Sequence, residues 1–304
     1  MTSTVPTVEV EHATARLLTQ PALADLAELS ARGVTSRWVR TPSGHLHLLD
    51  YGPADAVPVL ILPGITSPAI TMDFLARRLT DLVRPLVLDV RGRGLSDNAP
   101  TDAAGPLRGY DLGAYADDVD AVTAGLDLDR PILFGHSMGA RIAAVAAARG
   151  THPLRGTVLV DPPMSGPGRG PYPTPLAAFL GQLDQARRGT DADEVAASWP
   201  LWPRREQSLR ARWLGSCSRT AIVATHAGFE SEDFFATWPG VPSPTVLLRG
   251  GDSPVVTAAD AAEAARARPD AQIVDVPDAG HMVFWDQPAI GLGVARQALT
   301  TLLS

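Results

Sequence analysis

The chain has 304 residues, of which 45% are hydrophobic and 19% charged, and its formal net charge is −7 at pH 7. This balance is that of a globular protein and excludes the disordered class. Every basic residue is an arginine, and the arginines are scattered rather than clustered. Because an acidic chain without a basic stripe cannot follow a phosphate backbone, we expect no nucleic-acid partner.

The chain carries one cysteine, Cys217, which cannot form an intramolecular disulfide. No cluster of Cys and His residues has the spacing of a zinc site, so we expect neither a metal nor another cofactor. The first residues, Met1–Glu11, lack a basic region followed by an apolar stretch, and no run of about 18 apolar residues occurs. We therefore expect a cytoplasmic protein without membrane contact.

The N-terminal residues 1–33 predict a helical arm. Leucines recur among alanines and charged residues from His12 to Arg32, with a break at Pro21 and an end at Gly33. We expect this arm either to pack on the rest of the chain or to form the contact of a homo-oligomer.

Two alternating segments follow, Ser36–Arg40 and His45–Asp50. The turn sequence Thr41-Pro42-Ser43-Gly44 joins them, which predicts an antiparallel hairpin. After the hairpin, continuous apolar runs alternate with segments of helical length. Strands that are buried on both faces of a parallel sheet have this composition, and the intervening helices complete βαβ units.

The sequence therefore predicts an α/β fold in which a leading antiparallel hairpin precedes a mostly parallel, doubly wound sheet. After the two strands of the hairpin, the third to the eighth predicted strands are Val57–Leu62, Pro85–Val90, Pro131–Phe134, Thr157–Val160, Thr245–Leu248 and Gln272–Val276. The predicted helices are Ile70–Leu82, Tyr110–Leu126, Met138–Arg149 and a last one over about Pro288–Leu303.

The alternation is interrupted between the sixth and seventh strands, over residues 162–244. This stretch is at first rich in Pro and Gly and then broken into helical pieces. They contain four tryptophans, Trp199, Trp202, Trp213 and Trp238. Since ligands of open α/β sheets bind beyond the carboxyl ends of the strands, we expect a helical lid here and a core over residues 34–161 and 245–304. The tryptophans either grip an apolar substrate or pack the lid itself.

The sequence Gly135-His136-Ser137-Met138-Gly139 lies between an apolar strand and an Ala-rich helix. In such a tight strand-to-helix turn, a side chain two positions either side of Ser137 would strike neighbouring backbone. The turn leaves the serine hydroxyl exposed for attack. We therefore predict Ser137 as a nucleophile.

A serine nucleophile needs a base within hydrogen-bond reach, and a third group must orient that base. His281 lies after the last predicted strand, in Asp278-Ala279-Gly280-His281-Met282, and the base comes last in the chain order that accompanies such a turn. The other histidines precede the parallel sheet, belong to the turn itself or lie in surface or lid segments. His281 is the predicted general base.

Two backbone N–H groups should stabilise the negative charge that develops on an attacked carbonyl. Met138 supplies one by following the nucleophile. Ile65 is predicted to supply the other, because Gly64 in Leu62-Pro63-Gly64-Ile65-Thr66 permits an unusual backbone angle after the strand.

Together with the turn around Ser137 and the Gly280-His281 pair, the block Asp89–Ser96 (DVRGRGLS) resembles the α/β-hydrolase superfamily. More narrowly, four blocks are similar to the N-formylmaleamate deformylase family of aerobic nicotinate breakdown. They are Pro63–Thr71 (PGITSPAIT), Leu88–Ser96 (LDVRGRGLS), Gly135–Arg141 (GHSMGAR) and Leu159–Gly168 (LVDPPMSGPG). The resemblance implies an α/β-hydrolase fold with the lid inserted after the sixth strand.

Two carboxylates compete for the role of the acid that orients His281. Asp252 follows the seventh strand, which is the commonest location in the superfamily. Asp161 ends the sixth strand, where the deformylase resemblance places the acid. Both lie near the carboxyl edge of the sheet, so either could hold the histidine N–H, and the choice stays open.

The resemblance implies that Ser137 attacks a small N-formyl amide bearing a carboxylate, through a formyl-enzyme. The substrate carboxylate requires a basic partner, and the candidates are Arg141, one turn beyond the nucleophile, and Arg169, in the first loop of the lid. A carboxylesterase or a C–C bond hydrolase of aromatic catabolism would share every one of these catalytic groups. In a different class, the chain could be a non-catalytic ligand receptor on a hydrolase fold.

Overall fold

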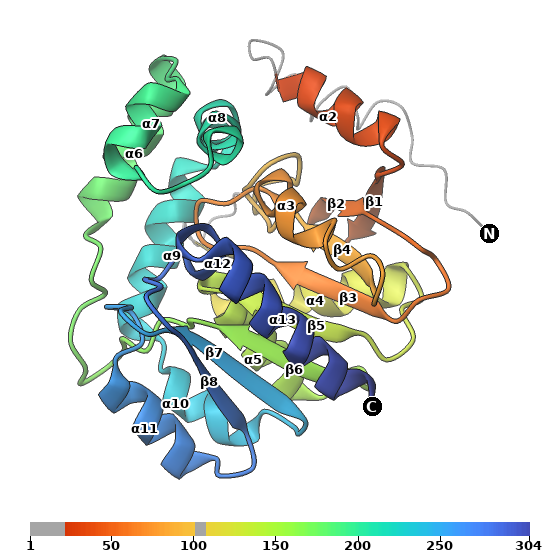
Figure 1. Cartoon of the computed structure of the whole chain (residues 1–304), viewed down its shortest axis with the longest axis vertical. Helices are drawn as coiled ribbons and strands as arrows, with labels where there is room; N and C mark the ends of the chain where they lie inside the picture. Colours follow the sequence, from red (N-terminus) through yellow and green to blue (C-terminus); the bar gives the residue numbers. More distant parts are fainter. Residues whose placement is uncertain (1–21, 101–107) are drawn as a thin grey trace.

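The computed structural model describes residues 22–100 and 108–304. They form one eight-stranded sheet with helices on both faces, and a further group of helices stands at one end of the molecule (Figure 1). Within the described ranges, no helix is both long and apolar enough to cross a membrane.

The sheet has the predicted architecture. The strand order is β1-β2-β4-β3-β5-β6-β7-β8. The antiparallel hairpin β1–β2 leads, β2 runs antiparallel to β4, and all pairs from β3 onward are parallel. The strands are β1 (Thr35–Thr41), β2 (Gly44–Asp50), β3 (Pro58–Leu62), β4 (Arg84–Leu88), β5 (Ile132–His136), β6 (Gly156–Val160), β7 (Thr245–Gly250) and β8 (Gln272–Val276). From β3 the chain adds β4 on one side and then β5 to β8 on the other side of the sheet. The prediction of an α/β, doubly wound sheet is therefore confirmed.

The central strands β5, β6 and β7 are buried along their whole length, whereas the edge strand β8 is partly exposed. Successive side chains of a strand point to opposite faces. In β5, Leu133 joins the apolar cluster on one face, while Ile132 and Phe134 join the cluster on the other. Both faces are covered by helices, which is why these strands contain unbroken apolar runs.

One face of the sheet packs against α4 (Leu112–Gly125), α5 (Met138–Arg149) and α11 (Ala258–Ala267). The other packs against η1 (Ala69–Met72), α3 (Asp73–Ala76), α12 (Val283–Asp286) and α13 (Pro288–Leu303). The bounds of α5 and α13 agree with the sequence predictions. The single helix predicted over Ile70–Leu82 is instead a 3-10 turn and one short α-helix, after which Leu79 and Leu82 donate to carbonyls three residues back rather than four.

Most of the predicted arm, residues 1–21, lies outside the described residues. Its described part forms α2 (Ala22–Ala31), which ends before Gly33 at a positive φ of 84°. Asp25 of α2 accepts hydrogen bonds from Arg212 Nε at 2.7 Å and from Trp213 Nε1 at 2.9 Å. This helix is therefore tied to the segment that lies between β6 and β7.

That segment is helical. Its elements are α6 (Leu176–Arg188), α7 (Ala192–Ser198), α8 (Arg204–Trp213), η2 (Leu214–Ser216), α9 (Arg219–Ser231), α10 (Phe234–Thr237) and η3 (Trp238–Gly240), and we call them the inserted helices. Figure 1 shows α6, α7 and α8 together at one end of the molecule. Trp202, Trp213 and Trp238 are buried, while Trp199 is only partly buried and lines a cavity described below. Three of the four tryptophans therefore serve packing.

The turn between β5 and α5 depends on the close approach of Gly139 to the backbone of β3. A Cβ atom added at Gly139 would lie 1.9 Å from the carbonyl oxygen of Leu62 in β3. We predict that Gly139→Ala lowers the free energy of unfolding by about 3 kcal/mol, because backbone on both sides would have to move. Urea unfolding monitored by circular dichroism checks this value.

Gly181→Ala in α6 is the matched control, since nothing lies within 4 Å of a Cβ atom at that exposed helical position. There we expect a gain of about 0.5–1 kcal/mol, because alanine restricts the unfolded chain more than glycine does. Equal effects of the two substitutions would contradict the close approach at Gly139.

Candidate active site

Ser137 lies at the turn between β5 and α5, in a backbone conformation that L residues rarely adopt. Its φ is 56° and its ψ is −121°. A Cβ atom at Gly135 would lie 2.2 Å from the carbonyl oxygen of Gly139, so only glycines fit on either side. The local packing therefore holds Ser137 in a strained position at the carboxyl end of β5.

The structure brings Ser137, His281 and Asp161 into one hydrogen-bonded chain. Ser137 Oγ lies 2.9 Å from His281 Nε2, and His281 Nδ1 lies 2.7 Å from Asp161 Oδ2. Asp161 is fully buried and also accepts the N–H of Gly250 at 3.0 Å and the hydroxyl of Ser253 at 2.6 Å. A carboxylate with these donors is acceptor-only, so His281 Nδ1 carries a proton and Nε2 is left to accept from the serine.

Asp252, the alternative acid, is not brought to His281. Its backbone N–H donates to the carbonyl of Ala279 at 2.9 Å, and its side chain is exposed. The chain turns after Gly250, and the side chain that reaches Asp161 is the hydroxyl of Ser253, the residue after Asp252. The residues at the end of β7 thus donate hydrogen bonds to Asp161 and place no carboxylate beside His281.

The loop that carries His281 is held by the neighbouring histidine, His136. Its Nε2–H donates to the carbonyl oxygen of His281 at 2.9 Å. Burial and, to a smaller extent, the nearby His281 lower the pKa of His136 to about 3. His136 therefore stays neutral and fixes the backbone of the loop without competing for the proton on His281.

The backbone N–H groups predicted to stabilise negative charge belong to Met138, which follows Ser137 in the chain, and to Ile65, which lines the cavity. Met138 is the first residue of α5, and the first N–H groups of a helix have no acceptor within the helix. Ile65 occupies a turn that is closed by a hydrogen bond from Ser67 N to Gly64 O at 3.1 Å, and it lines the cavity beside Ser137. Buried Arg93 donates to the Ile65 carbonyl at 3.0 Å, which holds this turn in place.

Neither arginine predicted to bind substrate lines that cavity. Arg141 is buried, and its guanidinium donates to the backbone carbonyls of Phe229 and Glu232 at the end of α9. Arg169 forms ion pairs with Glu263 and Asp260 of α11. Arg141, predicted from its spacing to the nucleophile, joins α5 to the end of α9, and Arg169, predicted from its place in the first loop of the lid, joins that loop to α11.

The cavity around Ser137 has a volume of about 70 Å³ and contains a different arginine, Arg210 of α8. The Arg210 side chain is buried and donates to Gln182 Oε1 at 2.7 Å and weakly to Thr66 Oγ1 at 3.3 Å. Burial lowers its pKa to about 10, so it remains a cation at neutral pH. No carboxylate among the described residues pairs with it, which is unusual for a buried guanidinium.

Tyr172 also lines the cavity. Burial raises the pKa of its hydroxyl well above the ordinary value, and Ser137 lines the same cavity. The ring packs against Phe229, with ring centroids 4.6 Å apart. A phenol that stays protonated is a fixed hydrogen-bond donor beside the serine oxygen.

Sequence reasoning missed both Arg210 and Tyr172, because they come from the inserted helices and the loop before them, far along the chain from Ser137. Within Arg204–Trp213, four arginines occur in ten residues, and no sequence signal distinguishes Arg210 from the others. The described residues contain no group of three or more His, Cys, Asp or Glu side chains placed to hold a metal ion.

Comparison with known proteins agrees with this geometry. Residues 59–290 match the model of the alpha/beta hydrolase family. An N-formylmaleamate deformylase of Pseudomonas putida is 43% identical over 240 residues, which cover 79% of this chain and 87% of the relative. A 2-(acetamidomethylene)succinate hydrolase of Mesorhizobium japonicum is 31% identical, over 77% of this chain and 84% of the relative.

Solved structures give the same result. The crystal structure of the N-formylmaleamic acid deformylase from Pseudomonas putida S16 superposes with a TM-score of 0.79 at 34% identity, covering 86% of this chain and 99% of that one. An E-2-(acetamidomethylene)succinate hydrolase structure superposes with a TM-score of 0.71 at 28% identity, over 88% and 99%. The chain therefore belongs to the alpha/beta hydrolase family and is a hydrolase.

Proposed function

We propose that this hydrolase removes the formyl group from a small N-formyl amide that bears a carboxylate, with N-formylmaleamate as the model substrate. One observation carries the choice of substrate. Arg210 is a buried cation in the same cavity as Ser137, and no carboxylate of the described chain neutralises it. A substrate carboxylate would supply the missing charge, and the deformylase relative supports the formyl amide.

In the first step, Ser137 Oγ attacks the formyl carbon while His281 Nε2 takes the hydroxyl proton. Asp161 stabilises the imidazolium that forms. The carbonyl oxygen becomes an oxyanion, and the N–H groups of Ile65 and Met138 donate to it. The tetrahedral intermediate therefore gains hydrogen bonds that the flat substrate lacks.

In the second step, the C–N bond breaks and His281 returns the proton to the leaving nitrogen, which releases a primary amide. This nitrogen belongs to an amide, so it departs more readily than a simple amine, and general-acid help from His281 suffices. Water, deprotonated by His281, then attacks the formyl ester. Formate leaves, and Ser137 regains its proton.

The inserted helices and the loop before them, residues 162–244, act as a lid in this proposal. They supply Arg210 and Tyr172 to a cavity of about 70 Å³, well below the roughly 300–1,000 Å³ of pockets that hold drug-sized ligands. A site of this size suits a compact substrate that is closed off from water.

The decisive experiment measures formate released from N-formylmaleamate beside its N-acetyl analogue and a panel of simple esters. We expect formate release to exceed the turnover of the other compounds. Hydrolysis of the esters without formate would favour a carboxylesterase. The absence of an acyl-enzyme burst with a nitrophenyl ester, together with no turnover, would favour a ligand receptor.

The hydrogen-bonded chain predicts sharply different effects for the two candidate acids. Ser137→Ala should reduce kcat about 10³-fold or more, and Asp161→Asn should reduce it by a comparable factor because His281 loses its orienting acceptor. Asp252→Asn should stay within about twofold of the wild type. Steady-state kinetics on all three variants test the assignment, and equal losses for the two Asp variants would overturn it.

The unpaired cation predicts a selective defect in substrate binding. Arg210→Gln should raise KM for the carboxylate-bearing substrate about 100-fold, because a charge-assisted hydrogen bond is lost in a buried site. Turnover of a neutral nitrophenyl ester should change little. Arg169→Gln is the control, and it should leave both substrates unaffected; a uniform loss on both substrates in Arg210→Gln would argue against carboxylate recognition.

The hydroxyl of Tyr172 is predicted to assist the serine. Tyr172→Phe keeps the ring on Phe229 but removes the donor, so kcat should fall about tenfold with KM nearly unchanged. Thermal unfolding should stay near that of the wild type, because the packing is preserved. A changed KM with unchanged kcat would instead assign Tyr172 to substrate binding alone.

A further inference from the structure

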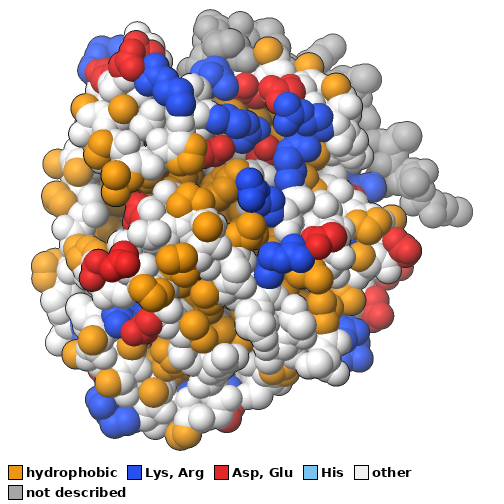
Figure 2. Space-filling view, in the orientation of Figure 1, with side chains coloured by type: hydrophobic (Ala, Val, Ile, Leu, Met, Phe, Trp, Pro, Cys, Tyr) orange, Lys and Arg blue, Asp and Glu red, His pale blue; other side chains and the backbone are white. Residues whose placement is uncertain are grey.

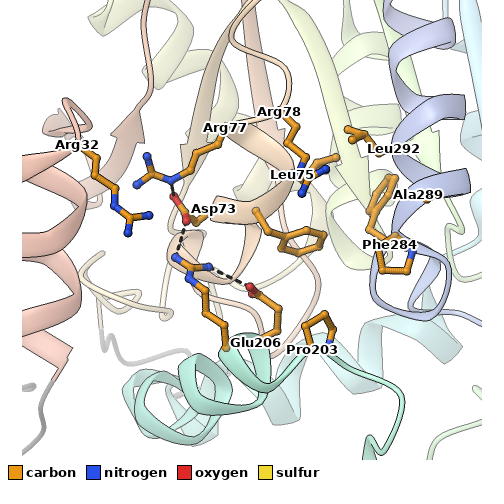
Figure 3. A pocket seen from close by; sticks show the side chains of 13 residues that line it. Arg32, Asp73, Leu75, Arg77, Arg78, Pro203, Glu206, Phe284, Ala289 and Leu292 are labelled. Atoms are coloured by element: carbon orange, nitrogen blue, oxygen red, sulfur yellow. Dashed lines mark hydrogen bonds and ion pairs between the residues drawn. The ribbon is translucent and has the colours of Figure 1, made fainter.

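A second, larger cavity of about 550 Å³ lies outside the site of Ser137, between the start of α8, the segment η1–α3, the end of α2 and the helices α12 and α13 (Figure 3). It shares no lining residue with the cavity around Ser137. We call it the arginine groove, because four arginines line it: Arg32, Arg77, Arg78 and Arg205.

Positive charge is in excess in this groove. Two carboxylates, Asp73 and Glu206, line it against the four guanidinium groups. Asp73 is buried and accepts from both Arg77 Nε at 2.7 Å and Arg205 Nη2 at 2.6 Å, and Arg205 Nη1 also donates to Glu206 Oε1 at 2.9 Å (Figure 3). Burial raises the pKa of Glu206, and its ion pair with Arg205 opposes this rise, so the excess of positive charge comes from the other two arginines, Arg32 and Arg78.

The remaining two arginines are at the rim. Arg78 is exposed, and no carboxylate among the described residues is paired with its side chain. Arg32 pairs only with Glu28 one turn earlier in α2, and both side chains are about half exposed, so water screens this pair. Arg78 and Arg32 are therefore available to an anion that enters the groove.

Two polar atoms of the groove residues are also unsatisfied. Arg77 Nη2 and Glu206 Oε2 are buried, and neither has a hydrogen-bond partner in the described part of the chain. Buried polar groups of native proteins are nearly always hydrogen-bonded. The groove residues therefore leave unused a donor on Arg77 and an acceptor on Glu206.

The opposite wall of the groove is apolar. Phe74, Phe284 and Leu292 line it together with Pro203, Leu75, Pro288 and Ala289. Figure 2 shows arginine side chains gathered on the part of this face where α2, α3 and α8 meet, with hydrophobic side chains beside them. The groove thus offers cations on one side and a flat, water-poor surface on the other, which is the usual composition of a small-molecule site.

We propose that the arginine groove is a binding site for a small organic anion, a carboxylate carried on a flat apolar body. The carboxylate lies against the exposed guanidinium group of Arg78, whose planar shape matches its two oxygens. The apolar body lies against Phe74, Phe284 and Leu292. This site is separate from the proposed chemistry at Ser137, and its occupancy does not depend on turnover.

Titration calorimetry with benzoate and with acetate tests the proposal on the full-length protein. We expect one benzoate to bind with a Kd of about 1 mM or tighter, and acetate to bind at least about tenfold more weakly because it lacks the apolar body. No binding of benzoate, or equal affinities for the two acids, overturns the proposal.

Two variants should weaken binding in the groove for different reasons, and both change an exposed residue, so the fold should be preserved. Arg78→Gln removes charge, and Ala289→Trp fills the space without changing charge. Each should weaken benzoate at least about tenfold. The matched controls are Arg204→Gln and Ile290→Trp, exposed neighbours that do not line the groove, and these should bind benzoate as the wild type does.

Arg210→Gln separates this site from the cavity around Ser137. Benzoate binding should persist in that variant if the groove holds the ligand. Binding that disappears in Arg210→Gln but survives in Arg78→Gln and Ala289→Trp overturns the proposal, and it would place the anion beside Ser137 instead. Because the readout is binding and not hydrolysis, a failure here leaves the formate assay untouched.

Discussion

The carboxylate of Asp161 connects the ends of three neighbouring strands. It lies just beyond β6, accepts the N–H of Gly250 and the hydroxyl of Ser253 at the end of β7, and accepts His281 from the loop after β8. The residue has a φ of 48°, a conformation that Asp tolerates better than most side chains. Since the carboxylate is fully buried, each of these hydrogen bonds is shielded from water, and the direction of the His281 ring depends on them.

Buried arginines connect the inserted helices to the core, and they differ in the atoms to which they donate hydrogen bonds. Arg93 donates to the backbone oxygens of Ile65 and Arg91 and to the hydroxyls of Tyr115 and Thr225. Arg141 donates to backbone carbonyls at the end of α9. The hydrogen bonds of these two guanidinium groups therefore go to the protein's own oxygens, and Arg141 Nε is left without a partner in the described part of the chain. Arg210 differs, because it lines the small cavity beside Ser137. Its hydrogen-bond acceptors are an amide oxygen and one distant hydroxyl, and its guanidinium lies 5.9 Å from the ring centroids of Trp199 and Trp202.

The two cavities differ in size and in how far their positive charges are compensated. The one beside Ser137 is small and enclosed by residues of the core and of the inserted helices, and it holds one unpaired cation. The arginine groove is larger, and its charges are only partly compensated by Asp73 and Glu206. Helix α8 contributes to both, with Arg205 in the groove and Arg210 beside Ser137. Residues five positions apart on a helix point in different directions, which is how one short helix lines two cavities.

The sequence by itself determined the features that depend on local geometry. The glycines around Ser137 are required by backbone contacts within a few ångströms, and the apolar strands follow from burial on both faces, so both could be read from short stretches of chain. Only the tertiary structure decided between Asp161 and Asp252, because both follow adjacent parallel strands and the direction of each side chain depends on how the chain turns afterwards. It likewise gave Arg141 and Arg169 partners elsewhere and brought Arg210 into the cavity of Ser137, since the partners of a long, charged side chain are set by elements far away in the sequence, which no local pattern records.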